Sequence, residues 1–98
     1  MTVERANVDV ADEDGRAALF EGEPRTVHLS LSAEDRVPAH DHRDREILFH
    51  VLDGEIALDL DEETHDLAAG DLLRFDGDSQ ISPKAVTDAR ALVVLANP

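Results

Sequence analysis

The chain has 98 residues, and its 23 acidic residues against nine basic ones give a formal net charge of −14 at pH 7. Such an acidic surface repels phosphate backbones, so we expect no nucleic-acid partner. There is no cysteine, no apolar run long enough to cross a membrane and no apolar leader, so we expect a cytoplasmic protein without disulfides, thiolate metal sites or a membrane partner.

The acidic excess has two interpretations. Acidic sequences with few aromatic residues can be disordered, but apolar residues make up 42% of this chain and recur in regular short runs. We therefore interpret the composition as that of a folded halophilic protein from a salt-rich cytoplasm, where salt screens the repulsion between carboxylates. Most single Asp and Glu residues then carry no chemistry.

Residues 1–25 form an N-terminal segment whose pattern is hard to interpret, although Val8, Val10 and residues 17–20 could add edge strands or lie across a neighbouring subunit. Residues 26–98 differ, because short runs of alternating apolar and polar residues follow one another with turn signals between them. This pattern predicts strands and almost no helix, so we expect a single barrel domain over residues 26–98.

The first predicted strands join through a tight turn. Residues 26–32 alternate cleanly, and residues 45–52 end at the pair Asp53-Gly54, a strong hairpin signal that leads into residues 55–60. Asp61-Glu62 then turns the chain into the next short run.

The later strands are shorter or more apolar. Residues 72–75 follow a turn at Gly70-Asp71, and residues 81–83 form an edge strand at most, because Pro83 removes a ladder donor. Residues 91–96 are continuously apolar, which suits a strand buried on both faces. Eight or so closely spaced strands predict an all-β protein built as a double-sheet jelly-roll barrel.

Three segments, VPAHDH, EILFHVLDGEI and THDLAAGDLLRF, resemble the cupin family, and the resemblance covers about residues 26–96. The first cupin motif contains a His-x-His pair, a glutamate three or four residues later and a closing glycine. His40, His42, Glu46 and Gly54 resemble that motif in order and approximate spacing. The resemblance implies a small single-domain cupin with a double-stranded β-helix.

The chain also departs from the cupin motifs. Seven residues rather than six separate Glu46 from Gly54, so counting back from Gly54 puts Ile47 at the glutamate position. In the second motif, which Gly70 opens, Ile81 stands where the last histidine is expected. These two motifs therefore do not supply the full set of three histidines and one glutamate.

His40 and His42 are the first candidate metal ligands, because residues i and i+2 of a strand point to the same face and place two imidazoles side by side. With the resemblance, Glu46 becomes the third ligand, and the cofactor would be a divalent transition metal, namely Fe, Mn, Ni or Zn. The alternatives are two surface histidines at a strand end and a solvated glutamate paired with Arg43 or Arg45.

The face of the strand on which Glu46 lies raises a geometric objection. A regular strand places Glu46, Leu48, His50 and Leu52 on one face and Ile47, Phe49 and Val51 on the other, and either face is a plausible interior. A β-bulge could turn both Glu46 and the pair Phe49 and Val51 toward the barrel.

Two other histidines have lesser roles. His50 would lie roughly 13 Å along the strand from Glu46, so one ion cannot be held by both. We expect His50 to line a pocket or to be structural, and an outward position at a dimer contact is the alternative. His28 shares the polar face of residues 26–32, and a neighbouring strand could bring it near His40 and His42 as a reserve ligand.

Two functions remain open. The resemblance implies a metal-binding cupin, which could be a metal-dependent enzyme acting on a small organic molecule. The alternative is a non-catalytic cupin, either a small-ligand binding or sensing module or a structural dimer without metal. In both cases we expect a homodimer, because the domain is small and its apolar strands have two faces to cover. The alternative predicts a metal-free pocket lined by Ile47, Phe49, Val51, Leu73 and Ile81.

Overall fold

The computed structural model describes residues 3–10 and 15–98, and residues 1–2 and 11–14 of the predicted N-terminal segment lie outside the described residues. Within the described ranges no helix is long and apolar enough to cross a membrane. The regular elements are η1 (Val8–Val10), β1 (Gly15–Phe20), β2 (Arg25–Leu31), β3 (Glu46–Asp53), β4 (Glu55–Leu60), β5 (Glu63–Ala68), β6 (Leu72–Asp76), β7 (Ile81–Ala85) and β8 (Ala89–Ala96).

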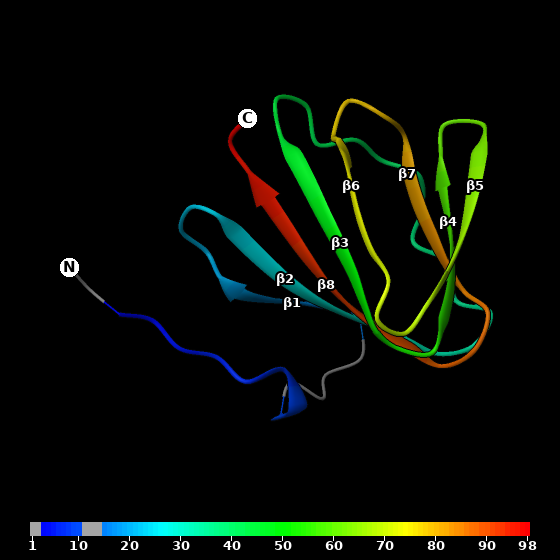
Figure 1. Ribbon diagram of the computed structural model, residues 1–98, viewed down its shortest axis with the longest axis horizontal. Helices are drawn as coiled ribbons and strands as arrows, with labels where there is room; N and C mark the ends of the chain where they lie inside the picture. The colour runs from blue at the N-terminus through cyan, green and yellow to red at the C-terminus, as the bar shows by residue number, and fades with distance from the viewer. Residues whose placement is uncertain (1–2, 11–14) are drawn as a thin grey trace.

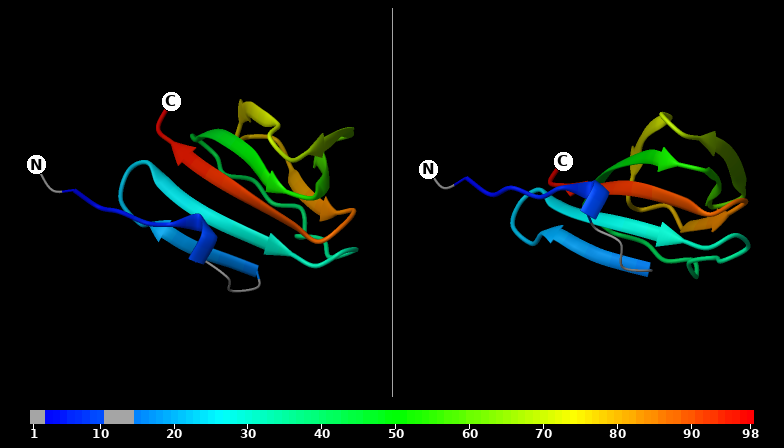
Figure 2. Two further views of the ribbon diagram at one scale, coloured as in Figure 1. Left: turned by 60° about the horizontal axis from the view of Figure 1, so that its bottom comes forward. Right: turned by 90° about the horizontal axis from the view of Figure 1, so that it is seen from below.

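The strands form two antiparallel sheets that face each other (Figures 1 and 2). The five-stranded sheet has the order β1-β2-β8-β3-β6, and the three-stranded sheet has the order β5-β4-β7. The hairpin predicted at Asp53-Gly54 joins β3 to β4, with Gly54 at a φ of 79°. The predicted all-β jelly-roll architecture is confirmed.

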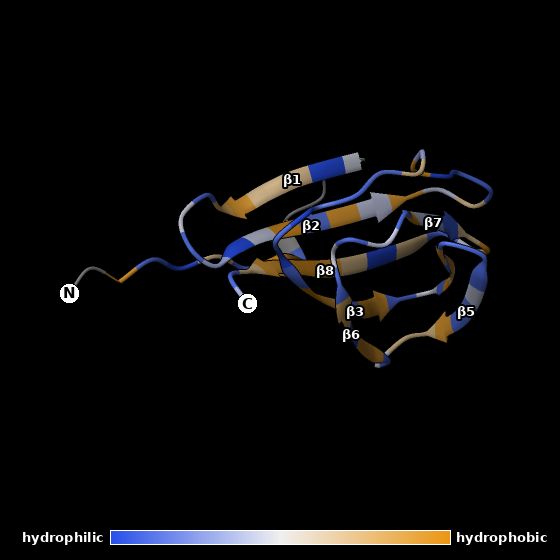
Figure 3. Ribbon diagram, turned by 90° about the horizontal axis from the view of Figure 1, so that it is seen from above, coloured by the Kyte–Doolittle hydropathy of each residue, from blue (hydrophilic) through white to orange (hydrophobic). Residues whose placement is uncertain are grey.

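The core lies between the sheets and follows from the alternation of the sequence. In β2 the apolar residues Val27, Leu29 and Leu31 are all buried. In β3 the residues from Ile47 to Val51 alternate between fully buried and half-buried side chains. Each fully buried aliphatic or aromatic side chain contributes about 1.5–3 kcal/mol relative to an exposed one. Figure 3 shows the hydrophobic stretches in β8, β3 and β6.

Strand β3 has a regular register near Glu46, where the sequence allowed a β-bulge. Its residues pair with β6 without interruption from Glu46 opposite Asp76 to His50 opposite Leu72. The irregularity falls at the other end of the strand, where the register against β8 shifts between Val51 and Asp53. The extra residue before Gly54 is therefore absorbed beside the hairpin and does not rotate Glu46 toward the barrel.

Other elements differ in detail from the expectations. Residues 8–10 form the 3-10 turn η1 rather than a strand, whereas residues 17–20 lie within the edge strand β1. Strand β7 is five residues long and lies at a sheet edge, in keeping with Pro83. Strand β8 is central, but its outer face, which includes Leu92 and Val94, is only half-buried. The homodimer that could cover this face remains a prediction.

Candidate functional site

A cavity of about 60 Å³ opens into the barrel between the two sheets. Thirteen described residues line it, and ten of them are apolar. Its floor includes Ile47 and Phe49, which are almost completely buried, and its rim includes the exposed Arg16. The polar side chains among the described lining residues are those of Arg16, His40 and His42.

The segment from His40 to His42 is held at both ends by backbone hydrogen bonds. The N–H of His40 donates to the carbonyl of Ile81 at 3.1 Å, and the N–H of Ile81 donates back to the carbonyl of His40 at 2.7 Å. The N–H of His42 donates to the carbonyl of Gly77 at 2.8 Å. The two rings meet edge to face with centroids 4.8 Å apart. The structure therefore brings together the two histidines that the sequence pairs.

Gly77 is needed for this arrangement because the chain passes so close to it. The residue is buried, and a side-chain methyl group there would overlap the carbonyl oxygen of His42 and lie 3.0 Å from that of Arg45. The N–H of Gly77 also donates to the carbonyl of Arg45 at 2.9 Å. Only glycine allows the loop after β6 to pass this close to the backbone of His42 and Arg45.

The ring of His40 has a defined orientation. Its Nδ1 lies 2.9 Å from the carbonyl oxygen of Pro38. A carbonyl can only accept, so Nδ1 carries the proton in this hydrogen bond. In the neutral ring, Nε2 is then the acceptor, and its lone pair is available for a ligand.

The pKa of His42 is lowered from its ordinary value. Burial is the main cause, because it disfavours the charged ring, and the neighbouring His40 acts in the same direction. The positive charges of Arg16 and Arg25 lower the pKa further, while Asp41 opposes the shift. His42 is therefore neutral at pH 7 and offers a hydrogen-bond acceptor or proton acceptor to the cavity.

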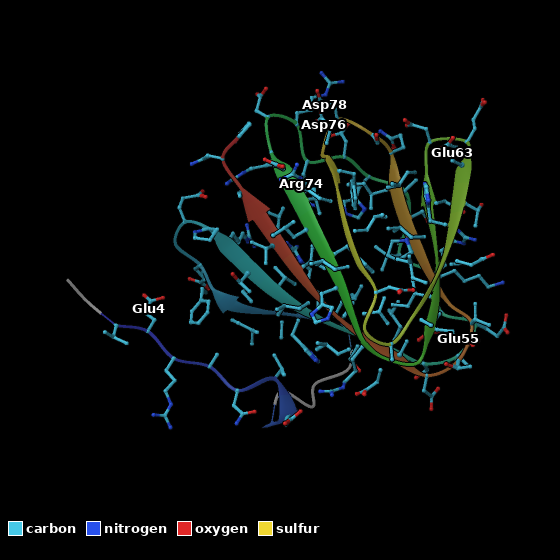
Figure 4. All side chains as sticks on the ribbon, viewed as in Figure 1. Glu4, Glu55, Glu63, Arg74, Asp76 and Asp78 are labelled. Atoms are coloured by element: carbon cyan, nitrogen blue, oxygen red, sulfur yellow. The ribbon has the colours of Figure 1, made fainter. Side chains whose placement is uncertain are left out.

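Glu46 lies away from this pair of histidines. It shares the outer face of the five-stranded sheet with Leu48 and His50, and its carboxylate pairs with the Nε of Arg74 at 3.0 Å. Figure 4 shows Arg74 near the end of the sheet where β3 begins. The geometry does not meet the prediction that Glu46 is the third ligand, because the regular register keeps it opposite to Ile47.

The remaining predicted site residues divide between cavity, core and outer face. Phe49 and Ile81 line the cavity together with Ile47, whereas Val51 is buried in the core outside the lining and Leu73 packs against that core. His50 is half-buried on the outer face of β3, so it does not line the cavity.

His28 also points away from the cavity, because it alternates with the lining residues Val27 and Leu29. Its side chain is completely buried, and neither ring nitrogen has a hydrogen-bond partner among the described residues. Burial, and then the charge of Arg90, lower the pKa of His28, so the ring is neutral. The structure does not bring it to His40 and His42 as a reserve ligand.

The sequence resemblance implies a divalent transition metal, but the described residues do not fit a site with three protein ligands. No group of three or more His, Cys, Asp or Glu residues within 3–10 and 15–98 could hold an ion. Ile47 faces the cavity at the position where the first cupin motif, counted back from Gly54, has its glutamate. Ile81 faces the cavity at the position where the second motif has its histidine. Catalytic zinc sites use three protein ligands, and among the described residues only two imidazoles line this cavity.

Sequence reasoning missed Arg16. It lies in the N-terminal segment whose pattern could not be assigned, and only its place opposite Leu29 in the ladder reveals that it faces the cavity. The alternation of β1 was the available signal, but an apolar run of four residues obscured it.

Comparison with known proteins agrees with this architecture. The family model for the cupin domain matches residues 27–96. Among solved structures, an RmlC-like cupin from Desulfovibrio desulfuricans is 25% identical, with a TM-score of 0.79 over 99% of this chain and 93% of that chain. A protein with a double-stranded β-helix domain from Klebsiella pneumoniae is 16% identical, with a TM-score of 0.84 over 98% of this chain and 91% of that one.

KdgF from Halomonas sp. is 15% identical, with a TM-score of 0.75 over 85% of this chain and 77% of that chain. No curated protein matches the chain significantly. The structural neighbours at these identities indicate the fold, whereas the family model covers most of the chain. The protein therefore belongs to the cupin family.

Proposed function

We propose that this protein binds a small organic molecule inside its barrel, with His40 and His42 as polar contacts, and that it does so without a resident transition metal. The composition of the cavity carries this proposal, because ten of the thirteen described lining residues are apolar. Small-molecule sites are typically concave and mostly apolar, with a few polar groups that fix orientation. A cavity of about 60 Å³ has room for roughly four water-sized groups, which suits a short molecule or the end of a longer one.

The two histidines would contact the polar end of such a molecule. The orientation of His40 leaves Nε2 as an acceptor in the neutral ring, and burial keeps His42 neutral. Ile47 and Phe49 would contact the hydrocarbon part. The described lining has no hydroxyl, thiol or carboxylate side chain, so the site supports binding better than a reaction that needs an activated nucleophile.

The experiment combines elemental analysis with a ligand titration, both in concentrated potassium chloride on protein purified without an affinity tag. Butyrate and butyramide serve as probes, because they share a short apolar chain and differ in charge. Binding is followed by ¹H–¹⁵N NMR at the amides of Ile47, Phe49 and Ile81. The double variant His40→Ala/His42→Ala tests the site, and His50→Ala on the outer face is the matched control.

We expect substoichiometric metal in the purified protein, and saturable binding of at least one probe at the cavity amides. Removal of both imidazoles should weaken that binding about tenfold, as expected for the loss of hydrogen bonds to a ligand, whereas His50→Ala should not change it. Stoichiometric Fe, Mn, Ni or Zn that is lost in the double variant would overturn the proposal in favour of a metal-binding cupin. Absence of binding by both probes would also overturn it.

A further inference from the structure

Two arginines face the cavity side of the five-stranded sheet. Arg16 in β1 lies opposite Leu29, and Arg25 at the start of β2 lies opposite Leu95. Residues directly opposite each other in a ladder point to the same face. Leu29 and Leu95 both line the cavity, so both arginines point to its side, and Arg16 itself belongs to the lining.

The described residues that line the cavity include one arginine and no carboxylate, although the whole chain is strongly acidic. The sequence has 23 acidic residues, yet no acidic residue is among the described lining residues. Every arginine from Arg36 onward forms an ion pair with a carboxylate, whereas none of the ion pairs between described residues involves Arg16 or Arg25. Their positive charges also act on the site: after burial and His40, both arginines lower the pKa of His42, while Asp41 opposes them.

We propose that the cavity binds a small organic anion, a carboxylate with a short apolar body, and that Arg16 pairs with its charge. A guanidinium presents two parallel N–H donors that match the two oxygens of a carboxylate. Ile47 and Phe49 then contact the apolar body, and the N–H of the neutral His42 ring can donate to a carboxylate oxygen beside the arginine. This inference rests on the proposed function and adds the charge class of the ligand to it.

An inward-pointing charge on an edge strand can have another role. Such charges block the pairing of an exposed strand with another chain, and β1 is the edge of its sheet. Protection of the strand edge does not require Arg16 to line the cavity, and it does not require the cavity lining to lack carboxylates. It also predicts that Arg16 can be neutralised without any effect on ligand binding, so the two roles can be separated by experiment.

The test compares butyrate with butyramide at pH 8 in one potassium chloride buffer. At this pH an ordinary histidine is neutral, so the positive charge at the site comes from arginine. Dissociation constants are measured by NMR titration for the unaltered protein, for Arg16→Gln and for Arg16→Lys. Arg74→Gln is the matched control, since it removes the same charge from an exposed arginine on the outer face.

We expect butyrate to bind about tenfold or more tightly than butyramide, as charge-assisted hydrogen bonds predict. Arg16→Gln should abolish this preference, Arg16→Lys should retain part of it, and Arg74→Gln should leave it unchanged. Equal binding of the two probes would overturn the inference but leave the proposed function standing. A preference for butyrate that survives Arg16→Gln would also overturn it, and absence of binding by both probes would overturn both proposals.

Discussion

Substitution of Gly77 by alanine tests whether the loop after β6 positions the histidines. The added methyl group would overlap the carbonyl oxygen of His42 and lie 3.0 Å from that of Arg45. Both neighbours are backbone atoms, so no side-chain rotation can relieve the contact. Either the loop or the segment from His40 to His42 must move.

The expected magnitude follows from two effects. Inserting a group into a well-packed region costs about 1–3 kcal/mol, and each intramolecular hydrogen bond contributes about 0.5–1.5 kcal/mol. Gly77 makes two backbone hydrogen bonds, to His42 and Arg45, and a shift would weaken at least one of them. We expect the free energy of unfolding to fall by about 2–4 kcal/mol, a large part of the 5–15 kcal/mol typical of a domain.

The assay is urea unfolding at a fixed concentration of potassium chloride, followed by circular dichroism. Gly22→Ala is the matched control, because a methyl group at Gly22 meets nothing within 4 Å and neither glycine has a positive φ. Its effect should stay within about 0.5 kcal/mol, as for most surface substitutions. Equal stability of Gly77→Ala and Gly22→Ala would refute the steric argument.

A second measurement separates positioning of the site from stability alone. The pKa of His42 is lowered mainly by burial, so displacement of its segment should raise that pKa toward its ordinary value in Gly77→Ala. The pKa can be followed by NMR titration of the ring protons. A destabilised variant with an unchanged pKa would mean that Gly77 supports the fold but does not position His42.

Three further predictions concern stability. His28→Leu should raise the free energy of unfolding, measured with urea, by about 1 kcal/mol, because it removes two buried nitrogens without partners among the described residues. If His28→Leu proved as unstable as His28→Ala, this reason would be contradicted. Because the pKa values of His28 and His42 are lowered in the folded state, the unfolded chain binds more protons below its histidine pKa of about 6.5. The stability that both residues contribute is therefore complete above that pH and is lost as the pH falls toward their folded-state pKa values. The melting temperature should fall between pH 7.5 and 5.5, and it should fall less in His28→Leu. A melting temperature that does not change with pH would contradict the direction of the two pKa shifts. With a net charge of −14, the protein should melt at a higher temperature in 1 M than in 0.1 M potassium chloride. The reason is that the screening length for repulsion between carboxylates falls from about 10 to 3 Å. An unchanged melting temperature would argue against the salt-adapted interpretation.

The strands could be predicted because their determinants are local. Alternation of apolar and polar residues assigns each run to a half-buried strand, and Asp53-Gly54 fixes the first hairpin. The pairing of His40 with His42 is local as well, since it depends only on the spacing of two residues. What the sequence leaves open is the place where the extra residue before Gly54 is accommodated. The inward or outward direction of Glu46 depends on that place, and periodicity alone cannot fix it.

Other parts of the site depend on contacts between distant segments. Gly77 supports His42 across a separation of 35 positions, and nothing in the residues around Gly77 indicates that contact. Arg16 reaches the cavity only because β1 pairs with β2, which sets it opposite Leu29. Both residues have ordinary local roles in the sequence, a loop glycine and a surface arginine, and acquire their roles in the site from the topology.

The positions of Ile47, Ile81 and Arg16 together bear on how this barrel could recognise a charged molecule. A metal ion at the centre of a barrel attracts an anion directly, but here the two inward positions that would complete such a centre are isoleucines. They add apolar surface, which cannot compensate the negative charge of an anion. A cationic side chain at the rim can compensate that charge. It also places the charge of the ligand near solvent, where removing the charge from water costs less than in the core. The apolar centre and the cationic rim are therefore compatible with one ligand, whose charged end lies at the rim and whose apolar end lies inside.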